Sequence, residues 1–254
     1  MLTVGDTRWN SQLTCLETYI RNHAGYTCVA NSHEDDIEKN IVKLIRDYNL
    51  LKQAKDLVKQ LKPVGDALDH LQGDKVNVAD ACGSWLDLLS DTNLQPHQRA
   101  VKKRFEEAIQ PMHYFAYMLH PQYRGAKLNE EQQEQARQWI ADRRPDLLPV
   151  VLCFTAEGEP YPQSYFAPQV ISNMDPAGWW KSLLRVTKRK ELQELADIMV
   201  HLLSCPASSA SVERVFSSFG IIHTKLRNRL GVERAAKLVF CYRMLRGKNT
   251  DDEY

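Results

Sequence analysis

The sequence predicts a mainly α-helical protein, and three observations support that fold class. Apolar residues recur three or four positions apart over most of the chain, as at Ile37, Ile41 and Leu44. Residues that can cap helices precede several of these segments. Runs that would suit a strand are scarce: the clearest is 150–154, and a weaker one is 220–222. We therefore expect helices to make up most of the fold.

Capping residues and prolines set the limits of the helices expected in the first part of the chain. Ser32, with Asp35 three residues later, resembles a capping arrangement, and Asn77 can cap a later helix. Pro63 is expected to break or kink one helix and Pro111 to kink another. The first expected helix runs from Thr7 or Asn10 to about His23. Helical periodicity then covers the positions from Ile37 to Tyr48 and continues through 50–61, and further helices are expected from Asn77 to Leu89 and from about Pro96 to Leu119.

The second part of the chain has an irregular stretch between helices. Asn129 can cap a helix that ends near Pro145. Proline, glycine and polar residues are then concentrated in 153–178, which predicts an irregular connection. Helices are expected to resume near Trp179 and to cover 190–203, 208–219 and 231–246. This organisation predicts a helical domain at 1–152, a connection at 153–178, a C-terminal region at 179–248 and an acidic tail at 249–254.

Composition excludes several classes of protein. The chain is 43% hydrophobic and 26% charged, which is typical of a globular domain. It lacks the roughly 18 continuous apolar residues of a membrane span, and its first residues do not resemble a secretory signal. The six cysteines form no CxxC pair and the histidines show no ligand spacing, so we expect reduced, buried thiols and no zinc site. No pattern indicates a small-molecule substrate.

The net charge of +1 hides a basic C-terminal segment. Residues 214–248 contain nine basic side chains and a single acidic one, Glu233. Such a segment can bind a polyanion such as DNA, or it can pack against the protein's own acidic body. The sequence leaves both interpretations open.

The last expected helix is apolar on more than one face. One stripe consists of Val232, Ala235, Ala236, Val239 and Tyr242, and a second stripe consists of Leu238, Cys241 and Leu245. A helix that is apolar over so wide an arc must be covered on two sides. The second cover is either a partner chain, which indicates dimerisation, or the core of a monomer.

Four short blocks occur in an order that is seldom met by chance. They are Asp6-Thr7-Arg8-Trp9-Asn10-Ser11, Leu119-His120-Pro121-Gln122-Tyr123-Arg124-Gly125, Asp175-Pro176 followed by Trp179-Trp180-Lys181, and Ser211-Val212-Glu213-Arg214-Val215-Phe216-Ser217 with Arg227-Asn228-Arg229-Leu230 behind it. Together they resemble the blocks of the hAT transposase superfamily, and the resemblance covers nearly the whole chain.

The resemblance implies a ribonuclease H-like fold that is split by a helical insertion domain. On this basis 1–152 would be the insertion-type domain and 179–248 the dimerisation region with a ribonuclease H-like remnant. In that family three carboxylates hold two divalent metal ions, and Glu213 stands where the last of them would be. The other two are aspartates that precede the Thr-Arg-Trp block, whereas only five residues precede Asp6 here.

We therefore expect a truncated or domesticated transposase-like protein that lacks both aspartates and the zinc-binding BED finger. Glu213 would be vestigial, serving as a helix cap or as the partner of a neighbouring arginine. No catalysis and no cofactor are expected, with magnesium or manganese bound only if the missing aspartates were supplied. The alternative is a fragment of an active DDE-type transposase whose upstream part is missing.

The resemblance and the helix pattern also name candidate binding residues. For nucleic acid these are Arg8, Trp9, Arg214, Lys225, Arg227 and Arg229, although Trp9 can equally pack the first helix into the core. For dimerisation they are Val212, Phe216, Val232, Ala236, Val239 and Tyr242. The expected partner is a second copy or a related hAT protein, with DNA as a further possibility and no membrane. The family resemblance implies a nuclear location, and without it the chain would be cytoplasmic.

Overall fold

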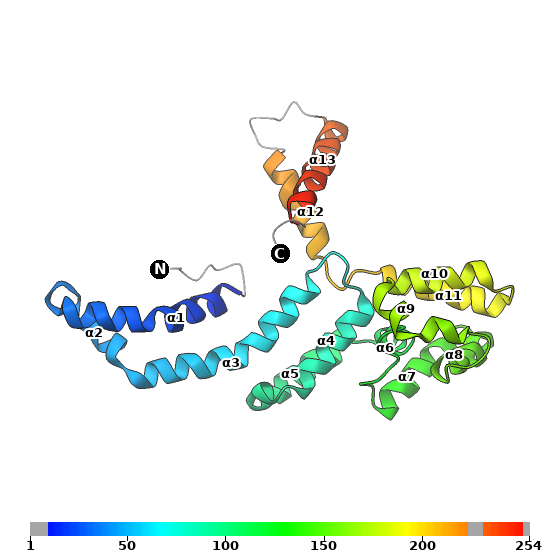
Figure 1. Ribbon diagram of the computed structural model, residues 1–254, viewed down its shortest axis with the longest axis horizontal. Helices are drawn as coiled ribbons and strands as arrows, with labels where there is room; N and C mark the ends of the chain where they lie inside the picture. The colour runs from blue at the N-terminus through cyan, green and yellow to red at the C-terminus, as the bar shows by residue number, and fades with distance from the viewer. Residues whose placement is uncertain (1–9, 223–230, 251–254) are drawn as a thin grey trace.

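The computed structural model describes residues 10–222 and 231–250 of the 254-residue chain. Figure 1 shows three parts: an extended arm, a body of packed helices, and a helical hairpin that projects from the body. Within the described residues, the secondary structure is helical apart from an isolated antiparallel β-bridge between Asn77 and Pro206. The prediction of a mainly α fold is confirmed. No described helix is both long enough and apolar enough to cross a bilayer.

The arm consists of α1 (Asn10–Ser32), the short α2 (Lys39–Arg46) and α3 (Tyr48–Leu71), with the 3-10 turn η1 (Glu34–Asp36) before α2. Helix α1 packs along α3, and the two run side by side in Figure 1. Gly65 makes this approach possible, because a Cβ atom there would lie 2.8 Å from Cδ2 of Leu13. The side chain of Asp47 caps α3 by accepting hydrogen bonds from the backbone N–H groups of Asn49 and Leu50.

One expectation about the arm is wrong, and of the two outcomes expected at Pro63 the structure excludes the break. The first helix does not end near His23 but continues to Ser32, whose hydroxyl donates to the carbonyl of Cys28 instead of capping a following helix. Pro63 does not break α3, which continues for two further turns. A proline removes one helical hydrogen bond, and packing against α1 at Gly65 holds the rest of the helix in place.

The body holds the main hydrophobic core. The expected caps at Asn77 and Asn129 are both confirmed, each as a reciprocal capping box, with Asp80 and Gln132 as the respective partners. Its helices are α4 (Val78–Ser90), α5 (Gln98–Ala108), α6 (Pro111–Met118), α7 (Glu130–Ala141), α8 (Leu148–Thr155), α9 (Pro168–Asn173), α10 (Pro176–Val186) and α11 (Lys190–Ser204), with 3-10 turns η2 (Thr92–His97), η3 (Pro145–Leu147) and η4 (Gln163–Phe166).

The structure corrects three expectations in the body. Residues 96–119 form two helices, because Ile109 is extended and Pro111 begins α6 at a position where its missing N–H costs nothing. The strand-like run 150–154 belongs to helix α8, and a short apolar run does not distinguish a strand from a buried helix. The segment 153–178, expected to be irregular, contains η4 and α9 and contributes Tyr161 and Phe166 to the core.

An aromatic cluster connects α8, η4 and α10. Trp179 and Trp180 are fully buried, and the ring of Trp180 stacks on Phe154 with 5.2 Å between centroids. The indole N–H of Trp180 donates to the carbonyl of Leu119 at 3.1 Å, and that of Trp179 donates to Tyr165 at 2.9 Å. Each buried indole thus has a hydrogen-bond partner, which removes the cost of burying its polar N–H.

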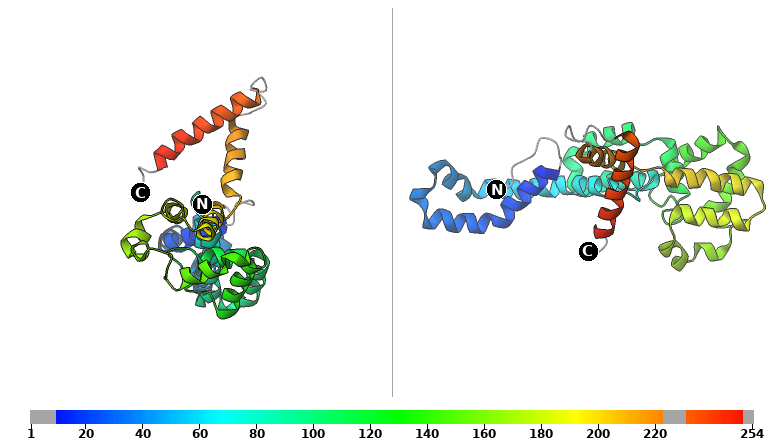
Figure 2. Two further views of the ribbon diagram at one scale, coloured as in Figure 1. Left: turned by 90° about the vertical axis from the view of Figure 1, so that its right-hand side faces the viewer. Right: turned by 90° about the horizontal axis from the view of Figure 1, so that it is seen from above.

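The hairpin consists of α12 (Ala210–Ile222) and α13 (Val232–Thr250). Both helices were expected, but 220–222 continues α12 as helix and not as a strand. Figure 2 shows the two helices meeting at the end remote from the body and diverging toward it. Contacts with α12 are the main packing that α13 makes with another element.

Candidate functional site

One side of α13 is covered by α12 of the same chain. Ala235 is fully buried, Val239 is 5% exposed and Ile222 of α12 is 8% exposed. Ala235 and Val239 belong to the first predicted stripe of α13, so that stripe has its cover within the molecule. Ala236, assigned to the same stripe, is exposed, and Tyr242 is half-buried.

The second predicted stripe of α13 has no cover within the described chain. Leu238 is 46% and Leu245 is 68% exposed, and Cys241 between them is exposed as well. These residues follow a 3,4 spacing, so they share one side of the helix. The neighbouring side carries Phe240 and Met244, at 66% and 54% exposure. The helix therefore presents a wide apolar surface to its surroundings.

Helix α12 also carries exposed apolar side chains. Phe216 is 70% exposed and Val212 is 50% exposed, and their i, i+4 spacing puts them on one face. Both were predicted to be dimerisation residues. Large exposed apolar side chains in such number on one two-helix element are typical of an interaction site.

A set of hydrogen bonds fixes the start of the hairpin to the turn between α3 and α4. The N–H of Ala207 donates to the carbonyl of Val76 at 2.9 Å, next to the bridge between Asn77 and Pro206. The hydroxyl of Ser208 donates to the carbonyl of Leu71 at 2.9 Å and accepts from the N–H of Ala210. Ser208 therefore acts as a capping group at the start of α12.

Arg214 completes this attachment. Its Nη2 donates to Oδ1 of Asp74 at 2.6 Å and to the carbonyl of Gln72 at 2.8 Å. The side chain predicted to contact nucleic acid is thus engaged by the protein's own acidic turn. This contact agrees with the interpretation in which the basic segment packs on the body.

Glu213 lies in the first turn of α12. Its Oε1 accepts a hydrogen bond from the hydroxyl of Ser209 at 2.6 Å, and its N–H donates to the carbonyl of the same residue. A negative charge at a helix N-terminus is favourable. The expected pairing of Glu213 with a neighbouring arginine is not what the structure shows, because Arg214 pairs with Asp74 instead.

A groove with a volume of about 810 Å³ separates the start of α12 from α1 and the end of α3. Leu68 and Leu71 contribute half-buried apolar surface to it. Asp69 and Glu213 contribute carboxylates, and neither forms an ion pair with another described residue. Among residues 10–222 and 231–250, no three carboxylate, histidine or cysteine side chains gather closely enough to hold a metal ion.

Several predicted site residues cannot be placed. Arg8, Trp9, Lys225, Arg227 and Arg229 lie outside the described residues, and nothing is described of the side chain of Val232. Their assignments stay predictions.

The cysteines are free but not all buried. Cys82 is fully buried, and burial raises the pKa of its thiol to about 12. Cys28, Cys205 and Cys241 are exposed, so the expectation that the cysteines would be buried is wrong for these three. Exposure at Cys241 follows from the missing cover on α13.

The His-Pro-Gln-Tyr block forms a buried polar network in the body. His120 is 1% exposed and stacks on Tyr123 at 4.0 Å, and the hydroxyl of Tyr123 donates to Oδ1 of Asp80 at 2.6 Å. Burial lowers the pKa of His120 to about 4, although the charges of Asp80 and Asp175 act in the opposite direction. The imidazole is therefore neutral at pH 7, and the block serves packing.

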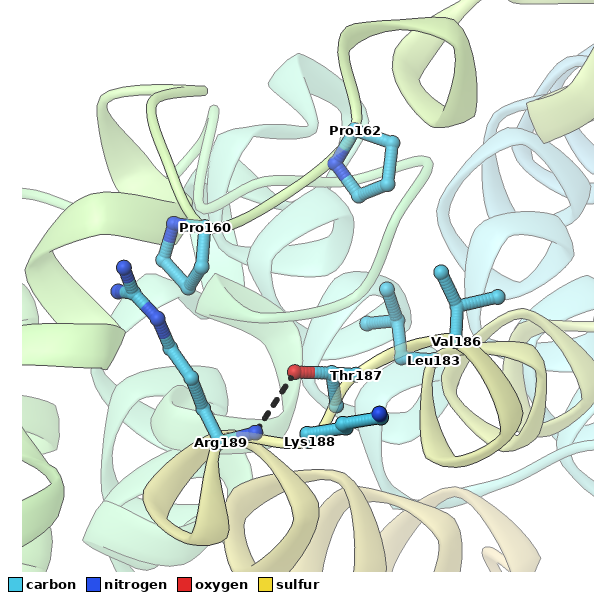
Figure 3. Close-up of a pocket in the computed structure, with 7 residues that line it drawn as sticks. All are labelled: Pro160, Pro162, Leu183, Val186, Thr187, Lys188 and Arg189. Atoms are coloured by element: carbon cyan, nitrogen blue, oxygen red, sulfur yellow. Dashed lines mark hydrogen bonds between the residues drawn. The ribbon is translucent and has the colours of Figure 1, made fainter.

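A second cavity lies at the loop between α10 and α11 and has a volume of about 390 Å³. Figure 3 shows Pro160 and Pro162 on one side and Leu183 and Thr187 on the other, with Arg189 at the edge. The N–H of Arg189 donates to the hydroxyl of Thr187 at 3.2 Å, which orders the loop. No predicted site residue lines this cavity.

Comparison with known families gives a match to the C-terminal part of the chain, which includes most of the hairpin. Residues 159–245, about a third of the chain, match the family described as the hAT family C-terminal dimerisation region. No curated protein matches this chain. The matched segment begins before η4, continues through α9, α10 and α11, and ends in α13, so it includes both the tryptophan pair and the exposed hairpin.

Sequence reasoning missed the groove and the attachment at the α3–α4 turn. Asp69 and Asp74 were not singled out, because Asp69 is an ordinary polar position of α3 and Asp74 stands in the turn that follows it, and both settings are typical of solvated side chains. The fold brings them next to residues far along the chain: Asp74, for example, binds Arg214, which is 140 residues later. The sequence carries no local signal for such a contact.

Proposed function

We propose that this chain is a hAT transposase-like protein that acts through self-association, with the α12–α13 hairpin as the contact surface. One observation carries the proposal: the most exposed apolar side chains of the hairpin lie within the segment that matches a dimerisation region. The partner is a second copy of the chain or a related hAT protein.

Burial of this surface would supply enough free energy for a stable dimer. Full burial of a large apolar side chain contributes about 1.5–3 kcal/mol. Phe216, Leu238, Phe240, Met244 and Leu245 are each between 46% and 70% exposed, so a dimer could bury part of ten such side chains. Their sum is of the same order as the roughly 4–15 kcal/mol that association costs in lost translational and rotational freedom.

Sedimentation velocity over a range of concentrations tests the proposal. We expect the wild-type chain to dimerise at about 10–50 μM, which corresponds to a free energy of association near −6 to −7 kcal/mol. Phe216→Ser should weaken the dimer. Tyr48→Ser is a matched control, because Tyr48 is 74% exposed on the arm, away from the hairpin. A wild-type chain that stays strictly monomeric at these concentrations would rule the proposal out.

We also propose that Glu213 has a structural role and does not serve catalysis in this chain. Its hydrogen bond from the Ser209 hydroxyl and its place in the first turn of α12 support a role in stabilising the start of that helix. In a strand-transfer assay with a hairpin DNA end and magnesium or manganese, we expect no product from the wild-type chain or from Glu213→Gln. Product from the wild-type chain alone would show that the glutamate is catalytic.

Nucleic-acid binding is a second candidate function. Arg234 and Lys237 are exposed on α13 and form no ion pair with another described residue, which supports it. Binding to duplex DNA should then weaken steeply as salt rises, and Arg234→Gln with Lys237→Gln should reduce the salt dependence. No measurable binding at about 50 mM salt would exclude this function.

The family resemblance supports two further proposals, one on the location of the protein in the cell and one on its fold. We propose a nuclear location, and that the α12 region corresponds to the C-terminal part of a ribonuclease H-like fold. A fluorescent fusion checks the location. An experimental structure of the chain with its native upstream sequence, if any exists, checks the fold.

A further inference from the structure

The charge of the hairpin argues against simple packing of one α13 on another. Residues 232–250 contain five basic side chains and one acidic residue, Glu233. Arg234 precedes Leu238, Cys241 and Leu245 with the same 4,3,4 spacing, so it lies on the exposed apolar side. Two such surfaces in contact would bring like charges together, which is unfavourable in a desolvated interface.

The groove beside α12 carries negative charge that is unpaired within the described chain, in contrast to the basic α13. Asp69 and Glu213 line it without an ion-pair partner among the described residues, and Leu68 and Leu71 give it apolar walls. Arg214 also lines the groove, but its charge is paired with Asp74. Phe216, 70% exposed, lies three residues after Glu213, so it stands beside the groove on the same side of α12. The groove thus offers the apolar surface and the negative charge that the exposed side of α13 lacks.

The chain's own α13 is placed away from this groove. Ile222, which is buried where α12 meets α13, lies nine residues after Glu213. At about 100° per residue this puts the two on opposite sides of α12. The chain's own α13 therefore does not enter the groove, and an α13 that does so comes from a second copy.

We propose that the groove lined by Leu68, Asp69, Leu71 and Glu213 receives α13 of a second copy, with Arg234 and Lys237 facing the two carboxylates. The inference rests on the proposed self-association and specifies its geometry. Each chain inserts its α13 into the groove of the other. The two contacts are then equivalent, and the exchange gives a closed, two-fold symmetric dimer. Glu213 in this arrangement is an interface residue.

Charge reversal on each side tests the arrangement. The groove variant carries Asp69→Lys and Glu213→Lys, and the helix variant carries Arg234→Glu and Lys237→Glu. Each variant alone places like charges in both contacts of its homodimer. We expect each to raise the dimer dissociation constant about tenfold or more in sedimentation velocity at about 0.1 M salt, and the effect to shrink at about 1 M salt.

A mixture of the two variants provides the decisive result. In the mixed dimer one contact joins an unchanged groove to an unchanged helix, and the other joins a basic groove to an acidic helix. Both contacts are attractive, so the mixture should dimerise with a dissociation constant within about threefold of the wild type. A direct α13–α13 dimer would also bring an acidic α13 against a basic one in the mixture, but it predicts that the groove variant alone dimerises normally. Loss of dimerisation by the groove variant together with rescue in the mixture therefore distinguishes the groove arrangement from a direct α13–α13 dimer.

Two kinds of control show whether a variant loses dimerisation because of the charges it carries at the contact or because it is unfolded. Asp197→Lys and Lys52→Glu reverse exposed charges away from the groove and the hairpin, and should leave dimerisation unchanged. Circular dichroism checks that each variant is folded. Because Asp69 accepts a hydrogen bond from Asn10, Glu213→Lys alone replaces the groove variant if the double variant unfolds.

The outcomes are distinct. A monomeric wild type contradicts self-association itself. A dimeric wild type whose charge variants dimerise normally, or whose mixture is not rescued, overturns the groove geometry and leaves self-association in place.

Discussion

The body buries its largest apolar side chains, whereas the hairpin leaves several of them exposed. In the body, Trp179 and Trp180 are fully buried. In the hairpin, Phe216 and Leu245 are 70% and 68% exposed. Both pairs belong to the single segment 159–245 that matches the dimerisation region. One part of that region therefore completes the core of its own chain, and the other part leaves large apolar side chains uncovered within the described residues.

This difference separates two kinds of experiment. Substitutions in the body should change the free energy of unfolding of the single chain. Substitutions in the hairpin should change the dissociation constant of the dimer and leave the unfolding of the monomer nearly unchanged. Four predictions test this separation, from the largest expected effect to the smallest.

Truncation in the aromatic cluster should have the largest effect. Trp180→Ala leaves a cavity beside Phe154 and removes the hydrogen bond to the carbonyl of Leu119. We expect the free energy of unfolding to fall by about 3–5 kcal/mol in urea denaturation. A loss below about 1 kcal/mol would mean that the cluster is not the centre of the core.

The buried imidazole should make the stability of the body depend on pH. The pKa of His120 is lowered to about 4 in the folded chain from 6.5, so the unfolded chain binds an additional proton between these values. Stability should be complete above pH 6.5 and fall as the pH decreases toward 4, by up to about 3 kcal/mol. His120→Gln should remove this part of the pH dependence, which urea denaturation at several pH values can measure.

Truncation in the hairpin should affect association and not folding. Phe216→Ala removes a mostly exposed side chain, so the unfolding free energy of the monomer should change by no more than about 0.5 kcal/mol. The dimer dissociation constant should rise about tenfold, because a buried aromatic anchor contributes at least about 1.4 kcal/mol. An unchanged dissociation constant would place the contact elsewhere.

The ion pair at the base of the hairpin should have the smallest effect on stability. The Arg214 and Asp74 side chains are 43% and 62% exposed, and such pairs contribute about 0.2–1 kcal/mol. Arg214→Ala should therefore cost less than about 1 kcal/mol in unfolding, but it should loosen the hairpin on the α3–α4 turn. Small-angle scattering of the monomer would detect this as a larger maximum dimension, and an unchanged profile would show that the backbone contacts suffice.

Much of the fold was predictable because it depends on local patterns. The spacing of apolar residues predicted most of the helices, and Asn77 and Asn129 marked two helix starts through their side chains. Errors occurred where local patterns compete. Pro111 starts a helix instead of kinking one. The apolar run 150–154 suits a buried strand and a buried helix equally well, and it is part of a helix.

The candidate site was predictable only in part, for a related reason. The two stripes of the last helix could be read from periodicity, and so could the need for two covers. Which stripe faces its own chain could not, because that depends on where α12 lies. Val239 was assigned to a dimer contact, yet it is buried within its own molecule, whereas Leu238 is exposed.

The sequence by itself determined that this protein is mainly helical, that its last helix needs cover on two sides, and that its C-terminal blocks resemble the hAT family. Helix formation and amphipathic patterning depend on near neighbours in the chain, so local spacing is sufficient to predict them. The tertiary structure alone decided that Arg214 binds Asp74, that Asp69 and Glu213 share a groove, and which stripe of α13 remains uncovered. These contacts join residues far apart in sequence, and they exist only once the arm, the body and the hairpin have packed together.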